Sequence, residues 1–259
     1  MLALTRKNKI QDMLTEHKSV TVTELSKYFE VTEETIRRDL KSLEDMGLLT
    51  RTYGGAFIQE GVENNVKISL REVAYTESKM TIAKACRNII QNGNSIFLDP
   101  STTSLFIAKT IQNMRLTVVT NSLLIVDQLA DCENIRLICI GGALSRDNKA
   151  FHGNVAAQML DFFYLDKAFI SCRSLSIEHG ITDASESIGR MRHKLLSRSN
   201  ETYLIADHSK FNKTSFLHIC NFEDLFGIIS DFKYTPEWIE LLHKKNVKII
   251  DCPSTQNEP

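Results

Sequence analysis

The chain has 259 residues, of which 42% are hydrophobic and 24% are charged, and its formal net charge at pH 7 is −1. This length and composition suffice for one large hydrophobic core or two smaller ones, and they exclude a long disordered chain. The balanced charge also excludes a uniformly basic coat, so any binding to nucleic acid has to come from a local cluster of cations.

The sequence has no membrane or secretion signal and no metal-binding pattern. No apolar run approaches the roughly 18 residues that a membrane span requires, and the N-terminal stretch MLALTRKNKI lacks the apolar core of a signal peptide. We therefore expect a soluble cytoplasmic protein with no membrane partner. The six cysteines form no C-x-x-C pair, and no histidine stands at metal-ligand spacing from another ligand. This pattern predicts reduced, structural cysteines and no metal site, and we expect no cofactor.

Residues 1–57 show the apolar period of amphipathic helices. The period predicts one helix within residues 5–20, a short second helix within residues 21–31, and a third that starts after Thr32 and stops at Gly47. Thr32 suits the N-cap position because its hydroxyl can accept a hydrogen bond from an amide of the first turn. Three such helices with a tight second connection are the helix-turn-helix plan.

The third predicted helix has two unlike faces. Its apolar residues fall in one narrow stripe, formed by Ile36, Leu40 and Leu43. Its basic residues fan out roughly opposite, at Arg37, Arg38 and Lys41. The following segment LLTRTYGGAF, residues 48–57, predicts a short basic hairpin, or wing. In such a domain the early residues of the third helix enter the major groove, where an arginine can donate two hydrogen bonds to guanine.

A second interpretation of these charges is a solvated helix surface with paired side chains. Glu34 lies four residues before Arg38, and Lys41 lies four residues before Asp45, which is the spacing of helical ion pairs. Residues 1–57 carry nine basic and nine acidic residues, so the region has no net charge. Charge alone therefore leaves both interpretations open.

The motifs of this region resemble the DNA-binding domain of the DeoR family of bacterial transcription regulators. The resemblance covers KIQDMLTEHKSVTVTELSKYFEV, residues 9–31, and TEETIRRDLKSLEDMGLLTRTYGGA, residues 32–56. It implies a winged helix-turn-helix domain over residues 1–57. It also implies DNA contacts by Thr32, Glu34, Thr35, Arg37, Arg38, Lys41, Arg51 and Tyr53.

From residue 76 to residue 252 the pattern changes to short β-branched runs that alternate with helical stretches. The runs are SIFLD, LTVVTN, IRLICIGG, KAFISC, TYLIAD, FGIISD and VKIID. This alternation predicts a mainly parallel α/β sheet with crossover helices. We expect residues 58–75 to be a linker or ordered hinge and residues 253–259 to be a tail.

Polar residues follow the strands of this predicted sheet, at the edge where ligands of open parallel sheets bind. Hydroxyl-rich loops follow the first two strands, and a Gly-Gly pair follows the third. Hydroxyls at a helix start suit a phosphate group, although serine and threonine at such positions are also common helix caps. Charged residues follow the later strands, where carboxylates suit sugar hydroxyls and cations suit phosphate. Surface ion pairs are the alternative for each of these charges.

The second region resembles the sensor domain of the same DeoR family. The matching stretches are DPSTTSLFIA, LTVVTNSLLIVDQLA, GGALSRDNKAFHGNVAAQML, DKAFISCRSL, GITD and ADHSKF. The resemblance implies a fold similar to ribose-phosphate isomerases and glucosamine-phosphate deaminases, and a phosphorylated sugar or sugar-derived intermediate as the ligand. It assigns phosphate or backbone contacts to Ser101, Thr102, Thr103, Thr120, Asn121 and Ser122. It assigns sugar contacts to Asp99, Gly141, Gly142, Asp183, Glu186 and Asp207, and charge complementarity to Lys210 and Arg173.

Three departures from the family pattern bear on the ligand. Pro100 and Ser101 stand where the family commonly has Ser-Gly, and Cys172 and Arg173 stand where it often has a glycine after the strand. After Glu186 the helix carries three basic residues, Arg190, Arg192 and Lys194, and the sequence does not say which takes the family's basic position.

Together these patterns predict a transcription regulator, most consistent with a repressor of a sugar-catabolism operon. Its expected partners are double-stranded operator DNA and a phosphorylated sugar effector. A homodimer or homotetramer is expected because paired half-sites need paired reading heads. The alternative is a phosphosugar isomerase-like or deaminase-like enzyme with an accessory helix-turn-helix domain, since polar strand ends could also supply acid and base groups.

Overall fold

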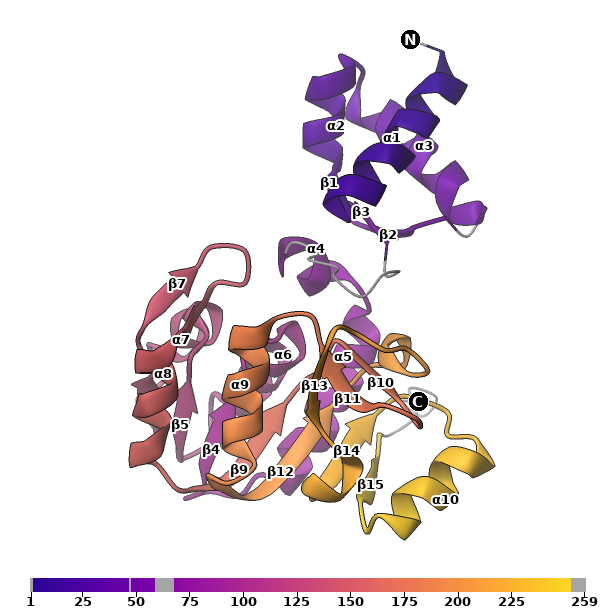
Figure 1. Ribbon diagram of the computed structural model, residues 1–259. Helices are drawn as coiled ribbons and strands as arrows, with labels where there is room; N and C mark the ends of the chain where they lie inside the picture. The colour runs from indigo at the N-terminus through magenta and orange to yellow at the C-terminus, as the bar shows by residue number, and fades with distance from the viewer. Residues whose placement is uncertain (1, 47, 59–67, 253–259) are drawn as a thin grey trace, which may run out of the picture. The chain divides into compact units, whose positions relative to one another are not determined.

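The computed structural model describes residues 2–46, 48–58 and 68–252. The chain divides into two compact units, Met1–Thr76 and Glu77–Pro259, and each is described by itself (Figure 1). Within the described ranges, no helix combines the length and the apolar character needed to cross a bilayer.

The first unit is a three-helix bundle with a small antiparallel sheet. Its helices and strands are α1 (Ala3–His17), β1 (Ser19–Thr21), α2 (Val22–Phe29), α3 (Glu33–Asp45), β2 (Thr50–Thr52), β3 (Gly55–Phe57) and α4 (Ile68–Val73). The sheet order is β1-β3-β2, and the β2–β3 hairpin is the predicted wing. The three predicted helices are confirmed, whereas β1 was not expected from the sequence.

Local capping sets the helix starts of this unit. Thr21 and Glu24 form a reciprocal capping box at the start of α2, and the Thr32 hydroxyl accepts from the Thr35 amide at the start of α3. The apolar stripes of the three helices then meet in one core, which includes Ile10, Leu14, Leu25, Ile36, Leu40 and Leu43. The predicted stop at Gly47 lies outside the described residues.

Part of the predicted linker is helical. Residues 68–73 form α4, and Leu70 and Ala74 pack on Phe57 of the wing in a small apolar cluster. The remainder of the predicted linker up to residue 67, except Ile58, and the predicted tail lie outside the described residues.

The second unit is built on a seven-stranded parallel sheet of order β15-β14-β12-β9-β4-β5-β6. Its strands are β4 (Ser95–Leu98), β5 (Leu116–Thr120), β6 (Ile135–Cys139), β9 (Leu165–Ile170), β12 (Ser199–Ile205), β14 (Gly227–Ser230) and β15 (Lys248–Asp251). Each of the seven predicted runs supplies one strand. The predicted parallel α/β sheet is therefore confirmed.

Helices cover both faces of this sheet. One core holds α5 (Thr76–Ile89), α6 (Thr102–Ile111) and α7 (Leu123–Leu129) against one face. A second core holds α8 (Asn154–Met159), α9 (Glu186–Leu195) and α10 (Pro236–Lys244) against the other. Short 3-10 turns lie at η1 (Leu160–Phe162), η2 (His208–Lys210) and η3 (Phe222–Asp224).

Two small antiparallel sheets were not predicted. The hairpin β7 (Ala143–Ser145) and β8 (Ala150–His152) follows the Gly-Gly pair. The second is formed by β10 (Ser174–Ser176), β11 (Gly180–Asp183) and β13 (Leu217–Cys220). Strands of three or four residues are too short for an alternating pattern to stand out in a sequence. Both sheets are formed by segments that follow strands of the main sheet and therefore start at its carboxyl edge.

Candidate functional site

The basic face of α3 is open to solvent, as its periodicity predicts. The Arg38 side chain is 81% exposed and lies 3.7 Å from Glu34, while the Arg37 side chain is 42% exposed and donates to Glu33 at 2.8 Å. Lys41 is exposed as well. These pairs follow the helical ion-pair spacing, so both sequence interpretations describe part of the surface. Exposed pairs of this kind are weak, and a DNA phosphate can displace the glutamates.

The N-terminal turn of α3 is held by threonine hydroxyls. Thr32 and Thr35 share a hydrogen bond of 3.0 Å between their side chains. Thr32 is exposed and Thr35 half-buried, so this turn can approach a duplex. Glu34 is exposed beside them.

The wing places its two predicted contact residues in different environments. The Arg51 side chain donates to Glu44 of α3 at 2.7 Å, and its backbone amide donates to the same carboxylate at 2.9 Å. Burial opposes ionisation of Glu44, but these bonds together with the charges of Arg51 and Lys41 lower its pKa below the ordinary value. Tyr53 lies at the tip of the hairpin and is 90% exposed. Arg51 therefore fixes the wing to α3, and Tyr53 is the side chain most available to a partner.

A buried ion pair that the sequence did not reveal positions α3. The Arg6 guanidinium of α1 lies 2.5 Å from the Asp39 carboxylate, and both side chains are buried. Asp39 is the acidic residue of the T-I-R-R-D-L motif. The pair ties the inner side of the candidate recognition helix to α1, which fixes the direction of its outer face.

In the second unit, Arg192 is the centre of a buried polar cluster at the carboxyl edge of the sheet. Its Nε donates to Asp99 at 2.9 Å, one terminal nitrogen donates to the Ser171 hydroxyl at 2.6 Å, and the other bonds Asp183. Asp99 also accepts from Ser104 at 2.7 Å and from the Ser171 amide at 2.8 Å. Burial alone would raise the pKa of Asp99, but Arg192 and these donors bring it below the ordinary value.

The sequence offers three basic residues for this position, Arg190, Arg192 and Lys194. The signal that identifies Arg192 is its place in the helical period. The buried residues of α9 are Gly189, Met191, Arg192 and Leu195, so Arg192 lies on the inner face of the helix. Arg190 points outward and pairs with Glu186. Lys194 pairs with Asp161. The basic side chain that enters the site is therefore Arg192.

The hydroxyls of the loop at the start of α6 are of two kinds: some bond other protein groups, and others have no partner among the described residues. Ser101 caps the helix with an extended backbone, at φ −99°, so serine in place of glycine carries no left-handed strain. The Ser101 and Ser104 hydroxyls bond each other and Asp99. Within the described residues, the Thr102 and Thr103 hydroxyls have no hydrogen-bond partner, and neither is fully enclosed. These two are the hydroxyls that a ligand can reach.

The loop after β5 carries an unpaired acceptor. Thr120 donates to the Leu98 carbonyl, and Ser122 caps α7 by accepting from the Ile125 amide. Asn121 donates to the Phe151 carbonyl at 2.8 Å, which fixes its amide. Its Oδ1 is buried and has no partner among the described residues. A buried oxygen of this kind is where a ligand hydroxyl can donate.

Asp183, the last residue of β11, belongs to the same polar cluster, and Asp207 follows β12 at the same edge of the sheet. Asp183 accepts from the Ala184 and Ser185 amides as well as from Arg192. Asp207 accepts from the Ser209 amide at 3.0 Å. Burial opposes ionisation of Asp207, yet Lys210, Ser209 and Lys79 lower its pKa below the ordinary value. Direct sugar contacts by Asp99, Asp183 and Asp207 remain predictions, since each carboxylate is already held by protein donors.

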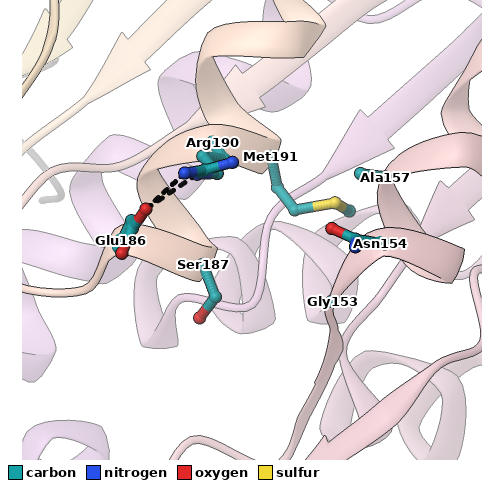
Figure 2. A pocket seen from close by; sticks show the side chains of 7 residues that line it. All are labelled: Gly153, Asn154, Ala157, Glu186, Ser187, Arg190 and Met191. Carbon is teal, nitrogen blue, oxygen red and sulfur yellow. Dashed lines mark hydrogen bonds and ion pairs between the residues drawn. The ribbon is translucent and has the colours of Figure 1, made fainter.

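A pocket of about 190 Å³ lies between the starts of α8 and α9 (Figure 2). It is lined by Gly153, Asn154, Ala157, Glu186, Ser187, Arg190 and Met191. Among the predicted effector residues only Glu186 lines it, and Glu186 pairs along α9 with Arg190, which also lines the pocket. Gly142 lies against Ala156 of α8. Its φ is +145°, and a Cβ added there would lie 2.6 Å from the His152 carbonyl oxygen, so the position requires glycine. Gly141 has open space around its Cβ position.

Within the described ranges, no three histidine, cysteine, aspartate or glutamate side chains come together as a metal site. A winged helix-turn-helix unit joined to a parallel α/β unit with a polar carboxyl edge defines the class of two-domain, ligand-responsive DNA-binding regulators. The chain belongs to the DeoR family: residues 6–62 match the DeoR-like helix-turn-helix domain, and residues 74–232 match the DeoR C terminal sensor domain.

Relatives of similar length are named as regulators. The chain is 35% identical over 253 residues to the uncharacterized HTH-type transcriptional regulator YulB of Bacillus subtilis (strain 168), covering 98% of each chain. It is 31% identical to the HTH-type transcriptional repressor GlcR of the same strain, covering 93% of each. It is 30% identical to the L-fucose operon activator of Haemophilus influenzae (strain ATCC 51907 / DSM 11121 / KW20 / Rd), covering 82% of this chain and 85% of the relative.

Among solved structures, ribose 5-phosphate isomerase A from Methanocaldococcus jannaschii is similar to part of the chain. The match covers 53% of this chain and 55% of the isomerase, at 15% identity and a TM-score of 0.40. A likeness of this size carries no argument about activity.

Proposed function

We propose that this protein is a DNA-binding repressor of a sugar-catabolism operon, and that a phosphorylated sugar at the carboxyl edge of the sensor sheet controls its affinity for operator DNA. The observation that carries the proposal is a set of polar groups at that edge that have no hydrogen-bond partner among the described residues. The Asn121 oxygen and an Arg173 nitrogen are buried, whereas the Thr102 and Thr103 hydroxyls are not fully enclosed. In a unit that follows a DNA-binding domain, such groups suit a regulatory ligand.

Each group has a role in the proposed complex. The Thr102 and Thr103 hydroxyls stand in the first turn of α6, where free amides and the helix dipole favour a phosphate. The Asn121 oxygen accepts from a sugar hydroxyl. Arg192 orients Asp99 and Asp183, so these three form the floor of the site and do not themselves need to touch the ligand.

On the DNA side, α3 enters the major groove with Thr32, Glu34, Thr35, Arg37, Arg38 and Lys41 toward the duplex. Arg38 and Arg37 carry most of the base or phosphate recognition, and Arg51 and Tyr53 bring the wing to the adjacent backbone. A homodimer or homotetramer supplies the second reading head, and the effector changes the spacing of the heads. The enzyme alternative is less well supported, because the relatives carry regulator names.

A gel-shift titration tests the DNA half of the proposal. The probes are DNA fragments upstream of the genes that neighbour the protein's own gene. We expect the wild type to retard one of them, and R37A/R38A to lose at least tenfold in affinity and to show a weaker dependence on salt. Arg115→Ala, an exposed arginine on the sensor unit, is the matched control. Full retardation by the double variant, or no retardation by the wild type at low salt, would contradict the proposal.

A thermal-shift panel of sugar phosphates tests the effector half. A ligand at 100 times its dissociation constant stabilises the protein by about 2.7 kcal/mol. The double variant T102V/T103V preserves side-chain shape but removes both hydroxyls. We expect it to lose the response to sugar phosphates while it still retards operator DNA. An unchanged response would place the phosphate elsewhere.

A further inference from the structure

Arg173 has a buried guanidinium nitrogen without a hydrogen-bond partner. Its Nη2 is one of three buried side-chain atoms in the described part of the chain that have none, together with the Asn121 oxygen and the Tyr234 hydroxyl. Within the described ranges Arg173 also forms no ion pair. A buried polar atom in this condition calls for a physical explanation, and here it belongs to the cationic group of a half-buried arginine.

The neighbouring carboxylates do not neutralise Arg173. Asp183 is the residue whose charge acts on Arg173, but its oxygens already accept from Arg192 and from two backbone amides. Burial accordingly lowers the pKa of the Arg173 guanidinium from its ordinary value, and Asp183 only partly opposes this. Among the described residues, Asp183 therefore opposes the desolvation of the Arg173 charge only in part, and no carboxylate pairs with it directly.

The Arg173 backbone lies at the carboxyl edge of the sheet. It comes three residues after β9, and its amide donates to the Thr182 carbonyl of β11 at 3.1 Å. Its neighbour Cys172 lies within the electrostatic reach of Arg192, Lys210, Asp183 and Asp207. Asn121 follows β5, and only β4 separates β5 from β9. The two unsatisfied groups thus lie on one edge, two strands apart, with the start of α6 between them.

We propose that Arg173 binds a second anionic group of the effector, so that the effector is a sugar derivative with two anionic groups: a phosphate together with a carboxylate, or two phosphates. This inference rests on the proposed function. The first phosphate takes its donors from the start of α6, and the second anion lies toward β11, where it neutralises Arg173. A ligand of this size spans the roughly 10 Å between strands that are two positions apart.

The test compares sugar phosphates with counterparts that carry one further anion. The probes are glucose 6-phosphate against 6-phosphogluconate, and fructose 6-phosphate against fructose 1,6-bisphosphate, each at millimolar concentration. The proteins are the full-length wild type, Arg173→Met, and the control Arg115→Met, whose exposed arginine lies before β5 at the opposite edge of the sheet. Thermal shifts and calorimetric titration give the dissociation constants.

We expect at least one compound with two anions to bind the wild type more tightly than its single-phosphate counterpart. Arg173→Met should lose that advantage, by a factor on the order of ten to a hundred, while Arg115→Met keeps it. Tighter binding of 6-phosphogluconate would identify the second anion as a carboxylate, and tighter binding of fructose 1,6-bisphosphate would identify it as a phosphate. Equal affinity of the wild type for both members of each pair would overturn the second anion and leave the proposed function standing. No response to any sugar phosphate would overturn both.

The ligand-free protein gives an independent result. Because the Arg173 side chain has no hydrogen-bond or ion-pair partner among the described residues, Arg173→Met should unfold at the same temperature as the wild type or at a higher one. A fall in the thermal midpoint as large as that of Arg192→Met would make Arg173 a structural residue and would overturn the inference.

Discussion

Replacing Arg192 by methionine tests whether its cluster holds the sensor unit together. Arg192 is buried and bonds two buried carboxylates and the Ser171 hydroxyl. Methionine keeps much of the side-chain volume but leaves Asp99 and Asp183 without their cation. Removing one partner of a buried ion pair costs about 3–5 kcal/mol, because the other charge stays buried. We expect a loss of this size in the free energy of unfolding of the sensor unit.

The chain carries its own probe for this measurement. Its single tryptophan, Trp238, is buried in the sensor unit, where its indole donates to Asn212 at 3.0 Å. Tryptophan fluorescence during urea unfolding therefore reports on the sensor unit. Arg190→Met, which breaks the exposed pair with Glu186, should change stability by less than about 1 kcal/mol. A loss below about 1 kcal/mol for Arg192→Met would refute the reasoning.

The same loss should depend on pH with a definite sign. The folded-state pKa of Asp99 lies below its ordinary value, since Arg192 and its hydrogen bonds outweigh the burial that would raise it. Stability from Asp99 is therefore fully present above its unfolded pKa of about 3.9 and is lost as pH falls through the lower folded pKa. The difference between wild type and Arg192→Met should be largest near pH 7 and should shrink below about pH 4. A difference that grows at low pH would contradict the assignment.

Three further variants separate structure from recognition. Arg6→Met leaves Asp39 buried without its cation, so we expect the free energy of unfolding of the DNA-binding unit to fall by about 3–5 kcal/mol. Circular dichroism should then show the loss of helix at a lower temperature. An unchanged melting curve would argue against this role of Arg6. Gly142→Ala forces a Cβ into a backbone carbonyl at positive φ and should destabilise the sensor unit in urea by more than about 1 kcal/mol, whereas Gly141→Ala, with open space, should not. Tyr53→Ala should leave stability unchanged, because the ring is exposed, but should weaken operator binding in gel shifts; unchanged affinity would remove the wing tip from the interface.

Local patterns in the sequence were enough for the main elements. The stripe of Ile36, Leu40 and Leu43 predicts α3 and its open basic face, because the helical period alone decides which side chains share a face. The seven β-branched runs predict the seven strands, because a strand buried on both faces needs a continuous apolar run. The same alternation predicts where the polar residues that follow the strands lie, because every strand of a parallel sheet ends at the carboxyl edge of the sheet.

The tertiary structure decided which of those polar residues bond one another. Arg192 meets Asp99, 93 positions away, only because strand order places β4 beside β9 and packs α9 over them. In the same way, Asp183 forms no ion pair with Arg173 because its carboxylate already accepts from Arg192. A sequence gives the spacing of side chains within one element, since that spacing is set by bond geometry. Partners between elements depend on packing in three dimensions, which a single sequence does not state.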